Sequence, residues 1–180
     1  MKGTENSGRK CVFFDRDGVV NVSPGPGYVE RWEDFHLLPG FVDVLRDVLG
    51  RGYVSVVVTN QRGVSLGLMS AGTVEDIHRG LRSLLSSTHG LELLDILYCP
   101  HGKGECECRK PKPGMLLEAA ARHGIDLAAS WLVGDHERDV EAGLAAGCRT
   151  VLVSPEPAGT RADFGVRDMA ELRVLLGREL

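Results

Sequence analysis

The 180-residue sequence lacks any apolar stretch that approaches the roughly 20 residues needed to cross a bilayer. Its opening segment, Met1–Lys10, is polar and has no apolar core of the kind that signal peptides carry. We therefore expect a cytoplasmic protein with no membrane partner. The same polar composition leads us to expect that residues 1–10 are flexible.

Basic residues are not in surplus either. The chain has 21 lysines and arginines against 25 aspartates and glutamates, for a formal net charge of -4. Proteins that bind a nucleic-acid backbone usually neutralise its phosphates with a basic surface, so this balance argues against nucleic acid and favours a small-molecule substrate. Internal repeats and low-complexity tracts are absent as well. At this length, 43% hydrophobic residues are typical of one domain, residues 1–180, which we expect to be a monomer.

Short apolar runs alternate along the chain with segments of helical periodicity. The apolar runs predict buried strands at Cys11–Asp15, Tyr53–Thr59, Leu93–Cys99, Ser130–Gly134 and Arg149–Val153. The periodic segments predict helices at Phe41–Gly50, Ala71–Thr88, Gly114–His123, Asp139–Ala146 and Asp168–Leu176. This alternation predicts a Rossmann-like, three-layer α/β/α fold around a central parallel sheet, with ligands at the carboxyl ends of the strands. Residues 21–40, rich in proline and glycine, predict a long loop.

Carboxylates gather at two of the predicted strand ends. Asp15 and Asp17 follow the first strand, and Asp135 and Asp139 follow the fourth. One aspartate can attack phosphorus to form an aspartyl phosphate, while a second gives a proton to the leaving oxygen and later takes one from water. The same groups offer the oxygen ligands that Mg²⁺ prefers. A single aspartate after a strand is often only a helix cap or a solvated loop residue, so the joint occurrence carries the prediction.

Two other segments supply groups that suit a phosphate. Thr59 and Asn60 end the second strand, and their hydroxyl, amide and backbone N–H groups could hold phosphoryl oxygens. Lys110 comes just before a predicted helix and could neutralise both Asp15 and a phosphate. A threonine at a strand end is also common without any function.

The order of these segments, D-x-D-G, T-N, K-P and G-D-x3-D, resembles that of haloacid-dehalogenase-like phosphohydrolases over most of the chain. The resemblance implies a nucleophile, a general acid/base and two groups that stabilise the phosphoryl group: Asp15, Asp17, Thr59 and Lys110, respectively. It also implies that Mg²⁺ is bound by Asp15, Asp135 and the backbone carbonyl of Asp17. Asp139 would then help to orient these ligands without binding the metal itself.

A cluster of cysteine and histidine residues follows the third predicted strand. Cys99, His101, Cys106 and Cys108 have C-x-H-x4-C-x-C spacing and supply the four ligands of a closed tetrahedral Zn²⁺ site. We therefore expect a zinc-bound loop at residues 99–108. The zinc would be structural, because no ligand position stays open for water. The alternative is a loop of reduced thiols without metal.

The zinc loop runs directly into the sequence C-R-K-P and resembles two related families: D-glycero-D-manno-heptose 1,7-bisphosphate 7-phosphatases and histidinol-phosphate phosphatases. Both lack a large cap domain, in agreement with the length of this chain. The segments D-G-V-V-N, G-Y-V and P-G-M are typical of the heptose family, whereas the four-residue spacer between His101 and Cys106 is nearer to the histidinol family. We favour the heptose family, which implies removal of the C7 phosphate during synthesis of nucleotide-activated heptose for surface polysaccharide such as lipopolysaccharide. Either anomer remains open.

Retention of the C1 phosphate would require a cation that recognises it. Arg109 is the candidate, since a guanidinium can grip a phosphate with two hydrogen bonds. Its alternative role is that of a solvent-facing residue on the zinc loop. Further candidate substrate contacts lie beside the motifs: Tyr28, Asn60, Gln61, Arg62 and His136. A hypothesis of a different class is a catalytically silent, zinc-bearing binding module, but the presence of every motif residue argues against it.

Overall fold

The computed structural model describes residues 8–180, so the flexibility expected for residues 1–7 lies outside the described part. Within this part, six parallel strands form a sheet in the order β3-β2-β1-β4-β5-β6. Their bounds are β1 Cys11–Phe14, β2 Val54–Asn60, β3 Asp95–Cys99, β4 Trp131–Gly134, β5 Arg149–Val153 and β6 Phe164–Val166. The five predicted strands are confirmed. β6 was not predicted, because three residues with a single buried side chain give no periodic signal.

Five α-helices lie where the sequence predicts them. Their bounds are α1 Phe41–Gly50, α2 Ala71–His89, α3 Gly114–His123, α4 Glu137–Ala146 and α5 Met169–Glu179, with short 3-10 helices at Trp32–Asp34 and Leu127–Ala129. Local signals set several of these limits. Ser70 caps α2 by accepting a hydrogen bond from the Thr73 N–H, and α2 ends where Gly90 turns left-handed with φ 65°. α4 starts before its predicted position, because Asp139 accepts from the His136 N–H at the helix start.

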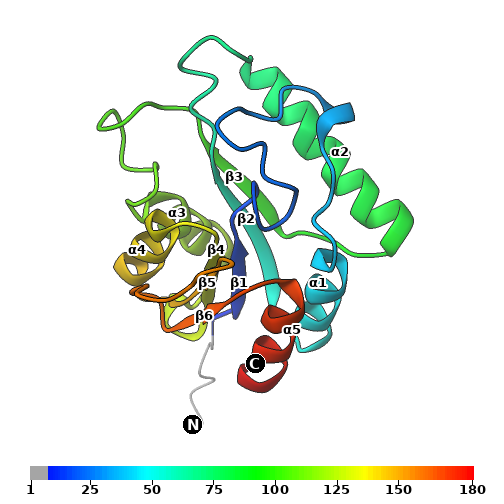
Figure 1. Ribbon diagram of the computed structural model, residues 1–180, viewed down its shortest axis with the longest axis vertical. Coiled ribbons are helices and arrows are strands. Elements are labelled where there is room, and N and C mark those ends of the chain that lie inside the picture. The colour runs from blue at the N-terminus through cyan, green and yellow to red at the C-terminus, as the bar shows by residue number, and fades with distance from the viewer. Residues whose placement is uncertain (1–7) are drawn as a thin grey trace, which may run out of the picture.

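The helices cover both faces of the sheet, as the predicted three-layer fold requires. Figure 1 shows α1, α2 and α5 on one side and α3 and α4 on the other. Alternate residues of β1 face the two layers. Val12 and Phe14 belong to the core under α1, α2 and α5, whereas Cys11 and Phe13 belong to the core under α3 and α4. All four side chains are 0% exposed, so both faces of this central strand are buried.

The loop between β1 and α1 is pinned at its base and at one point along its length. Val22 donates a backbone hydrogen bond to His36, and Leu38 donates one to Val20, both at 2.9 Å. Further along, Trp32 packs against α2 at Gly80, where an added Cβ would come within 2.5 Å of the indole ring. In the described part this connection contains only one short 3-10 helix, in agreement with the expected lack of a large cap. No helix of residues 8–180 has the length and apolar character to span a membrane.

Candidate active site

Two carboxylates meet where the strand order reverses. β1 and β4 are neighbours, and the chain leaves them in opposite directions along the sheet, which is where ligands bind in open parallel sheets. Asp15 follows β1, and its N–H donates to Val133 of β4 at 2.9 Å. Asp135 follows β4. Gly18 lies directly against Asp135: its φ is +93°, and an added Cβ would come within 2.2 Å of the Asp135 Oδ2.

Lys110 forms buried ion pairs with Asp15 and Asp139. Its Nζ lies 2.7 Å from Asp15 Oδ1, 2.7 Å from Asp139 Oδ1 and 2.8 Å from the Val58 carbonyl oxygen. Asn60 fixes the backbone at this lysine, because its amide donates to the Lys110 carbonyl at 3.0 Å and accepts from the Lys110 N–H at 3.1 Å. Lys110 is only 2% exposed, so its charge interacts with these carboxylates with little screening by water.

The electrostatics of this group follow from burial. Burial is the largest cause of a rise in the pKa of Asp15 to about 7; Lys110 opposes the rise, and Asp139 and Asp135 add to it. For Lys110, burial alone would lower the pKa, but Asp139 and Asp15 outweigh it and the pKa is raised. Lys110 is therefore a permanent cation at neutral pH. Asp15 needs a nearby positive charge to be fully ionised there.

Asp17 is held by three neighbouring side chains. Arg16 donates to both carboxylate oxygens, at 3.0 and 3.1 Å from Nη2 and at 3.2 Å from Nε. Asn21 donates to Oδ1 and Gln61 to Oδ2, each at 3.0 Å. The roles of Arg16 and Asn21 were not predicted. Arginine beside aspartate usually indicates an exposed ion pair, and nothing local in the sequence shows that Arg16 is buried.

Thr59 and Gln61 form a buried pair next to Asp17. Thr59 is 1% exposed, and its Oγ1 accepts a hydrogen bond from Gln61 Nε2 at 2.9 Å. The Thr59 hydroxyl can still donate its own hydrogen. Gln61 was expected among the substrate contacts, but it is 0% exposed and does not line the neighbouring cavity. In the structure it links Thr59 to Asp17.

A cavity of about 210 Å³ opens over this group. It brings together seven of the predicted site residues: Asp17, Tyr28, Asn60, Arg62, Arg109, Asp135 and His136. Residues 23–27 of the long loop form another part of the lining, together with Arg138, which was not predicted. The other predicted catalytic and supporting residues are buried: Asp15, Thr59, Lys110 and Asp139. Three arginines thus line the same cavity as two aspartates, an arrangement suited to an anionic ligand carrying a metal ion.

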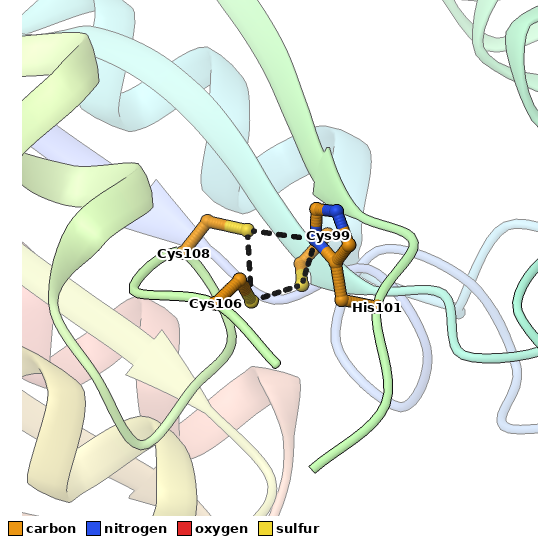
Figure 2. Close-up of side chains that lie close together, drawn as sticks. All are labelled: Cys99, His101, Cys106 and Cys108. Carbon is orange, nitrogen blue, oxygen red and sulfur yellow. Dashed lines mark hydrogen bonds between the residues drawn. The ribbon is translucent and has the colours of Figure 1, made fainter. Parts of the chain in front are cut away.

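The four predicted zinc ligands converge at the end of β3. Figure 2 shows their side chains pointing toward one another from the strand end and from the loop that follows. Cys99 Sγ lies 3.5 Å from Cys106 Sγ and 3.7 Å from His101 Nδ1. Cys108 Sγ lies 3.3 Å from Cys106 Sγ and 3.4 Å from His101 Nδ1. A tetrahedron with Zn–S near 2.3 Å and Zn–N near 2.0 Å has edges of roughly 3.5–3.8 Å, so this donor set fits Zn²⁺.

The zinc loop also contacts the segment that follows it, which carries Lys110. Arg109 directly follows the candidate ligand Cys108, and its Nη1 donates to the His101 carbonyl at 3.2 Å. Lys112 donates to the Cys106 carbonyl at 2.9 Å. Gly114, at the start of α3, lies so close to the loop that an added Cβ would be 2.3 Å from the Glu107 carbonyl. The loop that carries the four candidate ligands is therefore packed against residues 109–114, the segment that contains Lys110.

Comparisons with known proteins identify relatives over most of the chain. The HAD-hydrolase-like family model matches residues 107–161. D-glycero-beta-D-manno-heptose-1,7-bisphosphate 7-phosphatase of Pseudomonas putida is 42% identical over 158 residues, which cover 87% of this chain and 89% of the relative. D-glycero-alpha-D-manno-heptose-1,7-bisphosphate 7-phosphatase of Mycobacterium tuberculosis is 38% identical over 174 residues, which cover 93% and 91%.

A solved structure agrees with these relatives. The crystal structure of D,D-heptose 1,7-bisphosphate phosphatase from B. bronchiseptica, complexed with magnesium and phosphate, matches with a TM-score of 0.84 at 32% identity and covers 95% of this chain and 99% of that one. Of the two families that the sequence resembles, these comparisons support the heptose family. The chain belongs to the D-glycero-D-manno-heptose-1,7-bisphosphate 7-phosphatases, a family of haloacid-dehalogenase-like hydrolases.

Proposed function

We propose that the chain hydrolyses the C7 phosphate of D-glycero-D-manno-heptose 1,7-bisphosphate and leaves the C1 phosphate in place. The observation that carries this proposal is the buried contact of the Lys110 ammonium with the Asp15 carboxylate, 2.7 Å apart. The substrate is taken from the names of the relatives, which include both the beta and the alpha anomer. The proposal therefore covers both anomers.

The reaction that we propose has two steps on the same phosphorus. An Asp15 carboxylate oxygen forms a bond to phosphorus as the bond between phosphorus and the C7 oxygen breaks, and Asp17 gives its proton to the departing oxygen. Asp17 then takes a proton from water, whose oxygen attacks phosphorus and releases inorganic phosphate and free Asp15. Lys110 and Thr59 stabilise the negative charge of the phosphoryl oxygens during both steps.

Mg²⁺ is the metal that we propose for the carboxylate side of the site. Asp15, Asp135 and the backbone carbonyl of Asp17 would hold it, since Mg²⁺ favours a few carboxylates together with a substrate phosphate. When bound, it supplies positive charge that neutralises the phosphate and favours the ionised form of Asp15. The related structure is described as complexed with magnesium and phosphate, which supports this choice of metal.

Zn²⁺ is the metal that we propose for Cys99, His101, Cys106 and Cys108. The fit of the four donor atoms to a closed tetrahedron supports a structural role, with no open position for water. Metal analysis of the purified protein should find about one zinc per chain. A protein that folds and turns over substrate with no bound zinc would contradict this assignment.

Arg109 is the residue that we propose for the distal phosphate. It lines the cavity with Tyr28, Arg62 and His136, and its contact with the His101 carbonyl ties it to the zinc loop. Loss of charge-assisted hydrogen bonds to phosphate usually costs about 1.5–3 kcal/mol, so Arg109→Ala should reduce the preference for a bisphosphate over a monophosphate by about 10- to 100-fold. An unchanged preference would remove Arg109 from this role. Lys103→Ala, on the same loop, is the matched control.

A phosphate-release screen tests the function as a whole. The substrates are both anomers of the heptose bisphosphate, sugar monophosphates and histidinol phosphate, each with Mg²⁺. We expect the heptose bisphosphate to have the highest kcat/KM; faster turnover of histidinol phosphate would reverse the choice of family activity. Asp15→Asn should abolish turnover, and activity that survives this change would contradict the covalent mechanism.

A further inference from the structure

Arg16 is a charged side chain buried as completely as the core. It is 0% exposed and is the largest of the fully buried side chains in residues 8–180. Burial of a charge is costly unless the charge is paired and hydrogen-bonded. Lys110, the other buried cation of the described residues, is explained by its contacts with Asp15 and Asp139. Arg16 lies between the two aspartates of the D-x-D-G motif, and its burial needs a separate explanation.

The guanidinium of Arg16 is held from two sides. One edge, Nε and Nη2, donates to Asp17, while Nη1 lies 3.3 Å from Nε2 of His78 on α2. A guanidinium has no acceptor, so His78 Nε2 must accept and the ring proton is on Nδ1. Burial, followed by the charge of Arg16, lowers the pKa of His78 to about 3, in agreement with a neutral ring. The ring also packs edge-on against Tyr98 of β3 at 5.7 Å.

The backbone of Arg16 adds a third constraint. Its carbonyl accepts hydrogen bonds from the N–H groups of Val20 at 2.8 Å and Asn21 at 3.0 Å, which closes the turn after β1. Asn21 then reaches back to Asp17 through its side chain. The Asp17 side chain is 21% exposed and lines the cavity, so only its outer part faces a ligand. Arg16 thus restrains the side-chain torsions of Asp17 by linking its carboxylate to the packed interior.

We propose that Arg16 is a positioning residue for Asp17 and that His78 supports Arg16 from α2. This inference rests on the general acid/base role proposed for Asp17 and goes beyond it. Arg16 touches no reacting atom. It fixes the Asp17 carboxyl group at the distance and direction that proton transfer requires, and displacement of such a group by about 1 Å can cost on the order of 100-fold in rate.

A substrate with a good leaving group separates this role from a general loss of structure. When p-nitrophenyl phosphate transfers its phosphoryl group to Asp15, the bond from phosphorus to the phenolic oxygen breaks and p-nitrophenolate departs without needing a proton. Hydrolysis of the aspartyl phosphate still needs Asp17 to take a proton from water. Loss of Arg16 should therefore spare the first step and slow the second.

Rapid mixing of Arg16→Met with p-nitrophenyl phosphate and Mg²⁺ tests the proposal. We expect a burst of about one p-nitrophenolate per active site at close to the original rate, followed by steady turnover about 100-fold slower, the range of general acid/base contributions. Arg16→Lys should have a faster steady rate than Arg16→Met but a slower one than the original protein. His78→Phe should lower the steady rate of the original protein by about 10-fold, because it removes the contact with Arg16 Nη1 but keeps the contacts between Arg16 and Asp17. Arg82→Met, one turn beyond His78 on the same helix, should change neither phase.

Several results would overturn the proposal. One is an equal loss of the burst and of steady turnover in folded Arg16→Met; another is steady turnover in Arg16→Met that matches the original protein. If Arg16→Met does not fold, Arg16→Lys and His78→Phe decide, and a wild-type steady rate in both rejects the role. Asp17→Asn separates the positioning role of Arg16 from the acid/base role of Asp17. Full steady turnover in Asp17→Asn would refute the role proposed for Asp17 itself.

Discussion

Replacement of Lys110 by methionine should destabilise the protein while nearly preserving its shape. The change keeps the apolar stem but removes the ammonium, which leaves Asp15 and Asp139 buried without their cation. At the observed 2.7 Å, one charge pair is worth about 6 kcal/mol at an effective dielectric near 20. Much of this only offsets the desolvation of the charges, and the measured cost of removing one partner of a buried pair is about 3–5 kcal/mol. We expect a loss in that range.

The size of the loss should depend on pH in a defined direction. The pKa of Asp15 is raised from 3.8 in the unfolded chain to about 7 in the folded one, mainly by burial. A carboxyl group with a raised pKa contributes stability that is complete at low pH and is lost as the pH rises through the folded pKa. Lys110 lowers this pKa, so its removal extends the loss to higher pH. The gap between the two proteins should therefore widen above about pH 7.

Urea unfolding followed by circular dichroism, with magnesium omitted, measures this gap at about pH 6 and about pH 9. Lys103→Met is the matched control, because Lys103 is exposed on the zinc loop. Substitution of an exposed side chain away from such buried contacts usually costs little, so the control should unfold almost as the original protein does at both pH values. The reasoning is refuted if Lys110→Met loses less than about 1 kcal/mol, or if its loss is the same at both pH values.

Three other predictions concern the two proposed metal sites. Gly18→Ala should weaken Mg²⁺ binding and abolish most activity, because the new methyl would overlap Asp135; Gly52 also has positive φ, but an added Cβ there meets no atom within 4 Å, so Gly52→Ala should keep most activity. Mg²⁺ binding near pH 7 should release up to about one proton from Asp15, seen by calorimetry in buffers of different ionisation enthalpy, and identical heats would contradict this. Cys106→Ser should lower the zinc content and raise KM for a bisphosphate more than it lowers kcat, as metal analysis and kinetics can check; an unchanged zinc content would exclude Cys106 as a ligand.

The parts of the site that were predictable from sequence share a simple geometry. Asp15, Thr59 and Asp135 come directly at the ends of strong strand signals, and the carboxyl ends of parallel strands meet at one edge of a sheet. The four candidate zinc ligands lie within ten residues, from Cys99 to Cys108, so their spacing alone nearly fixes the cluster. In both cases the information is local, or it follows from a rule that holds for the whole fold.

The parts that were not predictable depend on distant contacts or on exact helix limits. Arg16 is buried against His78 of α2, which lies 62 positions away in the chain. Arg138 lines the cavity from the first turn of α4, whereas the sequence placed the helix start at Asp139. Gln61 has a polar side chain next to Thr59 and Asn60, which made it a candidate substrate contact, and only the folded structure shows that it is buried. Such features follow from tertiary packing, which a local pattern does not encode.

The way in which the loop after β1 is fastened has a consequence for engineering. The backbone hydrogen bonds of Val22 and Leu38 close its base, and the packing of Trp32 against Gly80 holds it to α2. Residues 23–28, which lie between Val22 and Trp32 in the chain, line the cavity. This short stretch can be exchanged as a cassette without touching the side chains that break the phosphate ester. A library randomised at residues 23–28 should therefore yield enzymes that accept different sugars while the chemical step is preserved.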